Sequence, residues 1–283
     1  MSDSPTRKDL VTFLSDFGHN GGGYVAACEA VIASLAPGVR VLHLSHEVGV
    51  GDVGWGSREL ARVAPLCPCA VHLAVVDPGV GTDRRPLVLV TGRGDRLVGP
   101  DNGLLIPGAE ALGGLTEAWL VEPDRVRRRA GLPETGVSPT FHGRDIFAPT
   151  AALLAIGVPT SELGRPFDVT ALARPRKPFF ETTPQGLTAE VIEIDRFGNV
   201  GLSARFDDCV FPRTSVKVEV VGEDLPVWNA RVVDTFGRLL SGELGVYRDS
   251  WGQVALALNG ASAAQLLSLN IGMMIRIELE ETA

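Results

Sequence analysis

Two polar clusters in this sequence carry side chains of catalytic type. Asp77 and Arg84 bracket a short Pro-Gly-rich turn directly after an apolar run, and His142 lies in the polar segment 141–145, which precedes another apolar run. Loops at the ends of regular elements commonly carry functional side chains. Each group also has a structural interpretation. Asp77 and Arg84 can form an ion pair that fixes their loop, and an isolated histidine beside a helix start is often a hydrogen-bonded structural residue.

Asp16 is a further candidate because it ends the first predicted strand and precedes a glycine-rich turn. In open α/β sheets, ligands bind beyond the carboxyl ends of strands. A carboxylate at that position can accept hydrogen bonds from both hydroxyls of a ribose. An Asx-turn explains the same residues equally well, and the glycines match neither GxGxxG nor GxxxxGK[ST]. Asn102 lies in a predicted turn at 100–103, from which its amide could reach a ligand.

The elements that hold these groups alternate between strand and helix patterns over the first 160 residues. Strands are predicted at 11–15, 39–44, 70–76, 87–91 and 96–99, and helices at 24–35, 53–63 and 147–156. This alternation favours an α/β domain with a mostly parallel sheet. We place it at residues 8–165.

The pattern changes after residue 164. Residues 164–186 contain four prolines and little periodicity, so we expect a linker at 166–186. Beyond it, short apolar runs predict strands at 187–194, 215–221, 227–233, 253–258 and 273–279. They favour a smaller all-β, barrel-like domain at 187–283.

A polar turn follows the first strand of this second half. Asp195, Phe197 and Asn199 fit a simple hairpin turn. The same three side chains could also bind a nucleoside, with the carboxylate on an amine, the phenyl group on a flat ring and the amide on a base edge. Further polar residues flank another predicted strand and are consistent with barrel turns: Tyr247, 250–252 and 259–262.

The overall composition opposes several classes of protein. The net charge of −8 argues against a general affinity for nucleic acid, which needs a basic surface. The basic run 125–129 fits a solvated helix or loop edge. The sequence contains neither an uninterrupted apolar run of about 18 residues, as a membrane span requires, nor an apolar signal core at its start. We therefore expect no membrane association and a cytoplasmic protein.

The cysteines and histidines do not form a metal-binding pattern. Cys67 and Cys69 lack the paired CxxC or histidine spacing of a zinc site, and the five histidines show no HExxH-like spacing. Together with Cys28 and Cys209, these cysteines are predicted to be reduced, partly buried thiols. We expect neither a metal nor a redox cofactor.

Six segments, taken in order, resemble the S-adenosyl-L-methionine hydroxide adenosyltransferase family, which is related to the fluorinating and chlorinating adenosyl enzymes. They cover nearly the whole chain and lie at 15–18, 76–84, 100–104, 140–145, 195–199 and 249–262. The resemblance implies an α/β domain, a C-terminal β-barrel and a homotrimer with active sites between subunits.

The resemblance also implies roles for individual residues. Asp77, Arg84 and His142 match the triad assigned to water activation. The resemblance places Asp16 at the ribose, and Asp195 and Ser250 at the methionine part of the substrate. It places Phe197, Asn199, Phe236 and the backbone at Gly260 at adenine. Asn102 and Trp251 complete the predicted set of substrate contacts.

The implied reaction is attack of water on the 5′ carbon of S-adenosyl-L-methionine, which gives adenosine and L-methionine. The leaving group departs as a neutral thioether and needs no general acid, whereas water must be positioned and lose a proton. We expect Arg84 to stabilise hydroxide character and His142 to accept the proton, because its ordinary pKa is near neutrality. Asp77, beside a cation, would orient the water.

Two alternatives remain open from the sequence. In the halogenating relatives, a tyrosine occupies the position of Asp77, and the residue at the position of His142 is not a histidine. A carboxylate there opposes halide use because it repels the anion. Gly51, Trp251 and Leu258 also differ from the pocket tryptophan and two arginines of the fluorinating relatives. The other alternative is a non-catalytic protein that senses S-adenosylmethionine or adenosine.

Overall fold

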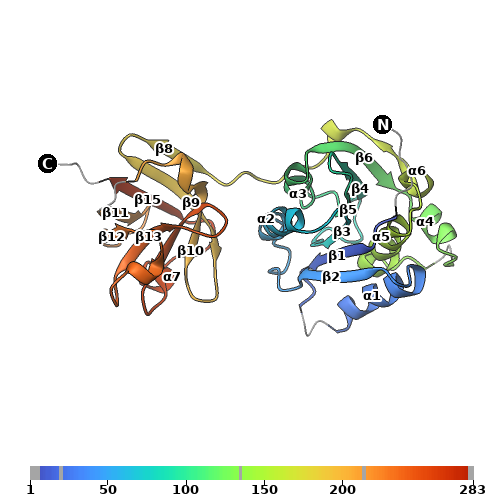
Figure 1. Ribbon diagram of the computed structural model, residues 1–283, viewed down its shortest axis with the longest axis horizontal. Helices are drawn as coiled ribbons and strands as arrows, with labels where there is room; N and C mark the ends of the chain where they lie inside the picture. The colour runs from blue at the N-terminus through green and yellow to red at the C-terminus, as the bar shows by residue number, and fades with distance from the viewer. Residues whose placement is uncertain (1–6, 19–21, 134–135, 212–214, 280–283) are drawn as a thin grey trace. The chain divides into compact units, whose positions relative to one another are not determined.

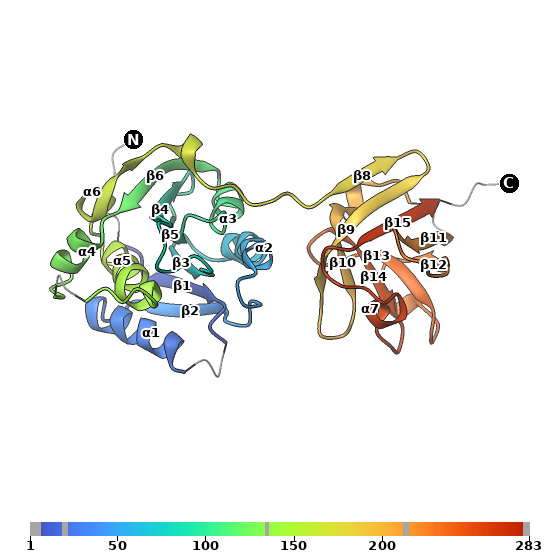
Figure 2. The same ribbon diagram turned by 180° about the vertical axis from the view of Figure 1, so that it is seen from behind.

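The computed structural model describes residues 7–18, 22–133, 136–211 and 215–279. The chain forms two compact units, Met1–Arg176 and Lys177–Ala283, whose elements are labelled in Figure 1 and seen from behind in Figure 2. Residues 19–21 of the predicted glycine-rich turn and residues 212–214 and 280–283 of the predicted second domain lie outside the described ranges.

The first unit is an α/β domain built on one sheet with the strand order β2-β1-β3-β5-β4-β6-β7. Strands β2, β1, β3 and β5 pair in parallel, while β4 is antiparallel to both β5 and β6, and β7 is antiparallel to β6. Most strands therefore run the same way, which confirms the mostly parallel sheet. Their bounds are β1 Leu10–Ser15, β2 Arg40–Ser45, β3 Val71–Val75, β4 Pro86–Thr91, β5 Arg96–Pro100, β6 Leu115–Val121 and β7 Gly164–Phe167.

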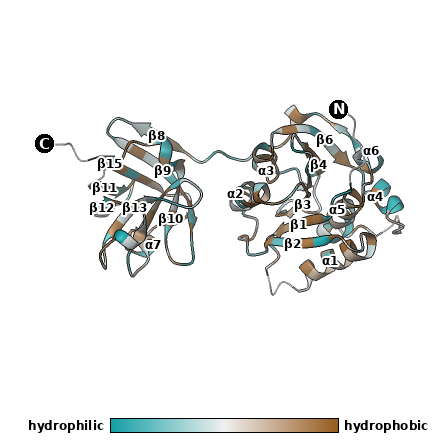
Figure 3. Cartoon of the chain, in the orientation of Figure 1, coloured by the Kyte–Doolittle hydropathy of each residue, from teal (hydrophilic) through white to brown (hydrophobic). Residues whose placement is uncertain are grey.

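Helices cover both faces of this sheet. Helices α1 (Tyr24–Leu35) and α5 (Ala148–Ala155) pack on one face with Phe13, whereas α2 (Val53–Val63) and α3 (Ile106–Ala111) pack on the other with Leu14. Burial on both faces explains why the central strands are almost continuously apolar, as the brown strands of Figure 3 show. The sequence predicted α1 and α2 with their observed bounds.

The basic run forms the short helix α4 (Pro123–Arg129), which is coloured hydrophilic in Figure 3. A solvated helix was expected, but Arg127 is buried. Its Nε donates to the Pro133 carbonyl at 2.6 Å. The expectation was therefore wrong for this one arginine, which ties α4 to the chain that follows it. Helix α6 (Thr160–Leu163) completes this side of the unit.

The second unit is a closed β-barrel, as predicted. Strand order β10-β14-β13-β12-β11-β15-β9 closes on itself because β10 also pairs with β9 at residues 191–194. Strand β8 pairs with residues 186–189 of β9. A short helix, α7 (Ala263–Leu266), packs on the barrel core. The strand bounds are β8 Phe180–Thr183, β9 Gly186–Ile194, β10 Val200–Arg205, β11 Ser215–Val220, β12 Trp228–Val232, β13 Leu244–Arg248, β14 Gln253–Leu258 and β15 Met274–Leu279.

The division between the units falls inside the segment expected as a linker, between Arg176 and Lys177. Both ends of that segment are nevertheless paired. Strand β7 adds to the first sheet through β6, and β8 adds to the barrel through β9. Both strands are only four residues long and show little apolar periodicity, so their pairing was not visible in the sequence.

The four cysteines are free thiols, as expected, with Cys28 and Cys67 buried. Burial raises the pKa of Cys28 to about 12, which keeps this thiol protonated and unreactive. Within the part of the chain that the structure describes, no helix is both long and apolar enough to cross a membrane.

A buried polar network lies at the centre of the first sheet. His72 Nδ1 is 2.8 Å from Thr12 Oγ1, and His72 Nε2 is 3.1 Å from Asp95 Oδ1. Asp95 also accepts hydrogen bonds from the Arg93 guanidinium and from the Ala70 N–H. Burial by itself would raise the pKa of Asp95, but the hydrogen bonds from His72, Arg93 and Ala70 lower it below its usual range. This network is structural, since Thr12, His72 and Asp95 have no exposed surface.

Replacing Asp95 should show how much this network stabilises the first unit. We expect Asp95→Asn to lower the free energy of unfolding at pH 7 by about 2–3 kcal/mol, because it removes a buried charge that accepts several hydrogen bonds. The folded pKa is depressed, so this stabilisation is present above the unfolded pKa of about 3.9 and is lost as the pH falls through the folded value. Chemical denaturation at pH 7 and at acid pH measures both effects.

The matched control is Asp124→Asn, which changes an exposed aspartate in the same unit and should alter stability by less than about 0.5 kcal/mol. Equal stability of Asp95→Asn and Asp124→Asn at pH 7 would contradict the assigned role.

Candidate active site

Asp77 and Arg84 form the ion pair that the sequence suggested. Arg84 Nε donates to Asp77 Oδ1 at 3.0 Å, and Arg84 Nη2 donates to Asp77 Oδ2. Both side chains are only 6% exposed. The guanidinium also lies over the Phe147 ring, 5.1 Å from its centroid. A bidentate pair of this kind fixes the plane and the position of both groups.

The loop between the two residues folds back through its own hydrogen bonds. Thr82 Oγ1 donates to the Gly79 carbonyl at 2.7 Å, and the Arg84 N–H donates to Thr82 Oγ1 at 3.3 Å. Gly81 has a φ of +78°, and a Cβ there would lie 2.5 Å from the Pro139 carbonyl oxygen. Glycine is therefore required at this turn, and its lack of a side chain lets the loop pack against the segment that leads to His142.

His142 joins the pair through its Nδ1 atom, which lies 2.9 Å from Arg84 Nη2. Arginine offers only donors, so His142 Nδ1 accepts, and the neutral imidazole carries its proton on Nε2. The structure thus brings Asp77, Arg84 and His142 together, although 58 residues separate Arg84 from His142. The expectation that His142 accepts a proton does not fit this arrangement, because Arg84 already occupies the one lone pair of the neutral ring.

A turn of π-helix, Gly143–Phe147, follows His142. Such turns recur at functional sites. Asp145 in this turn is buried, accepts from the Ser138 N–H at 2.8 Å, and pairs through both carboxylate oxygens with Arg144. Because Ser138 precedes Pro139, Asp145 holds the segment against which Gly81 packs. Asp145 therefore positions both His142 and the Asp77–Arg84 loop.

The surroundings of His142 keep it neutral at pH 7. Burial lowers the pKa of His142, and the Arg84 cation lowers it further, while the Asp77 and Asp145 carboxylates raise it. The net pKa lies below the ordinary value of 6.5. Neutral His142 therefore faces the site as an Nε2–H donor.

The cluster retains unused hydrogen-bonding capacity. Arg84 Nη1 is buried and has no hydrogen-bond partner among the described residues. Leaving such a donor unpaired is unfavourable, so a small oxygen ligand at this atom would relieve the penalty. Asp77 can accept further hydrogen bonds, because an ionised carboxylate has about four acceptor positions. Two N–H donors and one carboxylate acceptor form a suitable environment for a water molecule or a hydroxide ion.

Asp16 and Asn102 lie at the same carboxyl edge of the sheet, after β1 and β5. Asp16 Oδ2 accepts from the Gly51 N–H at 2.9 Å. Asn102 donates from Nδ2 to the Val76 carbonyl at 2.8 Å and accepts at Oδ1 from the Leu104 N–H at 3.1 Å. Asn102 thus fixes the end of β3 immediately before Asp77, whereas Asp16 Oδ1 has no hydrogen-bond partner among the described residues.

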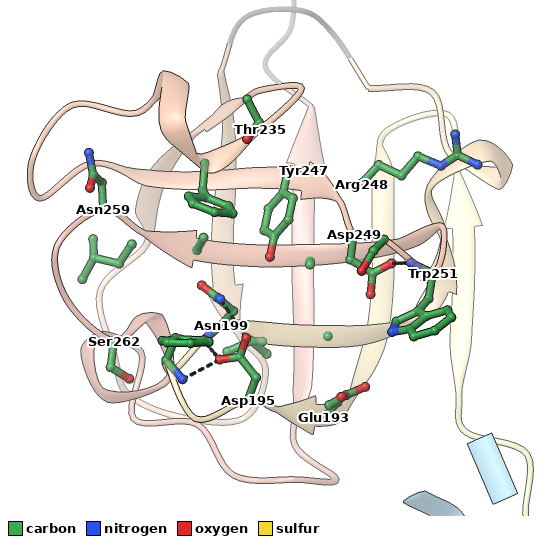
Figure 4. A pocket seen from close by; sticks show the side chains of 18 of the residues that line it. Glu193, Asp195, Asn199, Thr235, Tyr247, Arg248, Asp249, Trp251, Asn259 and Ser262 are labelled. Carbon is green, nitrogen blue, oxygen red and sulfur yellow. Dashed lines mark hydrogen bonds between the residues drawn. The ribbon is translucent and has the colours of Figure 1, made fainter. Parts of the chain in front are cut away.

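The second unit contains a pocket of about 910 Å³ that lies across strands β9, β10, β13 and β14, between the turns at the two ends of β14 (Figure 4). It brings together every candidate predicted in this half of the chain: Asp195, Phe197, Asn199, Phe236, Ser250, Trp251 and Gly260.

The segment at Asp195 forms the hairpin turn that its sequence predicts, and its side chains line the pocket. Asp195 Oδ1 accepts from the N–H groups of Phe197 and Asn199 at 2.8 and 2.9 Å, and Oδ2 accepts from Asn199 Nδ2 at 2.8 Å. Gly198 has a φ of +80°, and a Cβ there would overlap the Ser262 side chain. The carboxylate therefore builds the turn that presents it to the pocket, as Figure 4 shows.

Three of the pocket aromatics are unusually exposed. Phe197 is 73% exposed, Phe236 is 58% exposed, and Trp251 is 39% exposed. Phe236 meets Tyr247 edge-on at a centroid distance of 6.2 Å. Exposed aromatic rings gathered in one concave site indicate a surface for a flat, partly apolar ligand.

The pocket is also acidic, a property that the sequence did not reveal. Glu193, Asp234 and Asp249 line it together with Asp195, while Arg248, the one basic lining residue among the described residues, pairs with Asp207 at 2.9 Å. No spacing signal distinguishes these acids from ordinary surface carboxylates.

Tyr247 is another pocket residue that sequence reasoning left as a turn. Burial, together with the carboxylates of Asp195 and Asp249, raises the pKa of Tyr247 to about 12. The phenol thus remains protonated and can donate a hydrogen bond inside the pocket. Figure 4 shows Tyr247 between the Asp195 hairpin and the Asp249 turn.

Comparisons with known proteins agree over most of the chain. Residues 11–164 match the model of the SAM hydroxide adenosyltransferase N-terminal domain, and residues 189–276 match that of the corresponding C-terminal domain. A protein from Salinispora tropica named (R)-S-adenosyl-L-methionine hydrolase is 46% identical over 267 residues, covering 94% of this chain and 97% of that protein. A fluorinase from Actinopolyspora mzabensis is 29% identical over 308 residues, covering 98% of this chain and 99% of the fluorinase.

A solved structure is also similar. The crystal structure of an uncharacterized conserved protein from Thermotoga maritima superposes with a TM-score of 0.80 at 34% identity, covering 94% of this chain and 99% of that chain.

The charges around His142 can be tested without any substrate. We expect Arg84→Gln to raise the pKa of His142, because it removes a cation that disfavours the imidazolium ion, while the amide can still donate to Nδ1. Asp77→Asn should lower the same pKa, because it removes a favourable negative charge. NMR titration of the His142 ring in the three proteins measures both shifts. Shifts of the same sign in the two variants would show that the groups do not interact as described.

Proposed function

The chain belongs to the S-adenosyl-L-methionine hydroxide adenosyltransferase family, and from this premise we propose that it hydrolyses S-adenosyl-L-methionine to adenosine and L-methionine. The observation that carries the proposal is the cluster of Asp77, Arg84 and His142, in which two N–H donors, Arg84 Nη1 and His142 Nε2, accompany one carboxylate acceptor.

The acidic and aromatic pocket suits this substrate. S-Adenosylmethionine carries a sulfonium cation and an ammonium group, both of which are favoured by nearby carboxylates. Its adenine ring can stack on exposed aromatic side chains, and its sulfonium can lie against an aromatic face. The four carboxylates and the exposed rings of the barrel pocket supply both types of contact.

The proposed step forms one bond and breaks one. A lone pair of water attacks the 5′ carbon, the C–S bond breaks, and its electron pair remains on sulfur as neutral methionine. Asp77 accepts a hydrogen bond from the attacking water and is the acceptor available for its proton, which then passes to solvent. Arg84 Nη1 or His142 Nε2–H donates to the oxygen and stabilises hydroxide character. A weak base is sufficient because the leaving group is already cationic.

The proposal extends to assembly, cofactors and location. We infer a homotrimer in which the Asp77 cluster of one subunit and the barrel pocket of a neighbour act on one substrate molecule. The family resemblance supports this arrangement. We also propose that no metal or redox cofactor takes part, that neither nucleic acid nor membrane is a partner, and that the protein is cytoplasmic.

A halide-dependent adenosyl transferase is the alternative within the enzyme class, and a sensor is the alternative outside it. Against the halide, Asp77 places a carboxylate at the nucleophile position and neutralises Arg84 through both of its oxygens. The intact Asp77–Arg84–His142 triad favours the enzyme over the sensor.

Product analysis tests the proposed function directly. We expect purified protein to convert S-adenosylmethionine to adenosine and methionine at a rate that chloride does not change. Both sulfur epimers should be supplied separately, because the Salinispora relative is named for the (R) form. Chromatography identifies the products. A 5′-chloro product would establish the halide alternative, and tight binding without turnover would establish the sensor.

The matched variant for this assay is His142→Ala. It should reduce kcat by about 10²-fold, because one donor to the developing charge is lost, and it should leave KM nearly unchanged. An equal loss in kcat and in substrate affinity would reassign His142 to binding or folding.

The acidity of the pocket leads to a separate prediction. Asp234 lines the pocket and is exposed, so Asp234→Asn removes one charge with little structural effect. We expect it to weaken binding of cationic S-adenosylmethionine by about two- to fivefold, as for an exposed ion pair, and to leave binding of neutral adenosine unchanged. Calorimetric titration with both ligands measures this difference. Equal weakening of both ligands would show that Asp234 acts through the shape of the pocket and not through its charge.

A further inference from the structure

A chain of hydrogen bonds outside the Asp77 cluster links four side chains from separate elements. Glu29 Oε1 on α1 lies 2.9 Å from His43 Nε2 on β2, and His43 Nδ1 lies 2.6 Å from His46 Nε2 in the loop after β2. His46 Nδ1 lies 2.7 Å from Ser15 Oγ at the end of β1. The proposed reaction uses none of these four residues.

This series of hydrogen bonds runs from the solvent-exposed surface to the interior of the first unit. The Glu29 and His43 side chains are 40% and 39% exposed, whereas His46 is 2% exposed and Ser15 is fully buried. The Phe13 ring packs against both imidazoles, with its centroid 4.7 Å from that of His46 and 6.1 Å from that of His43. This packing fixes the ring planes.

The partners also determine the direction of every hydrogen bond when both imidazoles are neutral. Glu29 only accepts, so His43 carries its proton on Nε2, and its Nδ1 accepts from His46 Nε2–H. His46 Nδ1 then accepts from the Ser15 hydroxyl. Ser15 Oγ in turn accepts from the Phe17 N–H at 3.3 Å. All bonds point toward the Glu29 carboxylate, and bonds aligned in this way strengthen one another.

His46, at the buried end of this series of hydrogen bonds, contacts residues on both sides of Asp16 in the sequence. His46 contacts Ser15 through its ring, and its carbonyl accepts from the Gly18 N–H at 2.8 Å. The loop that continues from His46 supplies the Gly51 N–H, which donates to Asp16 Oδ2 at 2.9 Å. The position of the second Asp16 oxygen therefore depends on where His46 holds this turn.

We propose that Glu29, His43 and His46 form a positioning relay that fixes Asp16 to receive the ribose hydroxyls of the adenosyl group. The inference rests on the proposed function, because it takes Asp16 as the ribose contact. The three residues touch no substrate. They act through Ser15 and the turn that carries Asp16.

Two substitutions at His43 separate the relay from simple packing. His43→Phe keeps a ring against Phe13 but removes both hydrogen bonds. His43→Gln can still accept from His46 through Oε1 and donate to Glu29 through Nε2. The probes are adenosine and 2′-deoxyadenosine, which differ in one ribose hydroxyl. Calorimetry gives both affinities for each protein, and NMR of the His46 ring reports whether its proton stays on Nε2.

We expect His43→Phe to weaken adenosine binding by about three- to tenfold, as for the loss of one hydrogen bond, and to change 2′-deoxyadenosine binding much less. His43→Gln should keep most of the adenosine affinity. Glu29→Gln changes only the exposed end and provides a second test if His43→Phe does not fold. It should weaken adenosine binding in the same direction by a smaller factor.

The outcomes distinguish this inference from the proposed function. If His43→Phe weakens both nucleosides equally, or neither, the relay does not position the ribose contact. If the unmodified protein binds adenosine no better than 2′-deoxyadenosine, Asp16 is not a ribose contact and the relay inference is wrong, even when hydrolysis is observed. If the unmodified protein neither hydrolyses S-adenosylmethionine nor binds adenosine, the proposed function itself is wrong.

Discussion

The guanidinium of Arg84 determines the chemical state of the groups around it. Its bidentate contact fixes Asp77, and its Nη2 donor fixes the tautomer of His142. An arginine cannot release its proton under ordinary conditions. Asp77 therefore cannot move, and His142 cannot change its tautomer, without breaking a hydrogen bond to a permanent cation. The same cation helps to lower the pKa of His142. The cluster is therefore a fixed set of donors with one carboxylate acceptor, and it is not a base–acid pair that exchanges protons internally.

The fold holds this cluster by connecting loops that lie far apart in the sequence. Parallel strands end at one edge of the sheet, so the residues after β1, β3 and β5 meet there. The Asn102 amide fixes the end of β3, Asp145 fixes the segment before His142, and the close approach of Gly81 to Pro139 joins the two loops. Each of these contacts is polar or steric and lies outside the apolar core. The core sets the positions of the strands, and these few contacts set the positions of Asp77, Arg84 and His142.

The fold was largely predictable from the sequence because apolar periodicity is strong where burial is complete. Helix α1 and strand β14 were predicted with their observed bounds. Strand β13 was missed because its sequence, Leu-Gly-Val-Tyr-Arg, lacks regular alternation. The candidate residues came from strand ends and from family resemblance, and the structure brings them together in two clusters. The His142 tautomer was not predictable, since it depends on which ring nitrogen faces Arg84. Glu193 and Asp234 looked like surface acids because only barrel closure places them in one pocket.

The two units make different electrostatic contributions to the proposed reaction. Carboxylates around a sulfonium stabilise the bound substrate, but the sulfonium charge disappears as the C–S bond breaks. Contacts that favour the substrate at least as much as the transition state lower KM and do not raise kcat. The barrel pocket should thus determine which adenosyl compound binds and should release the uncharged nucleoside readily. Rate acceleration has to come from groups that interact more strongly as water gains hydroxide character, and these are the N–H donors of Arg84 and His142. In the proposed reaction, different residues would therefore select the substrate and accelerate its hydrolysis.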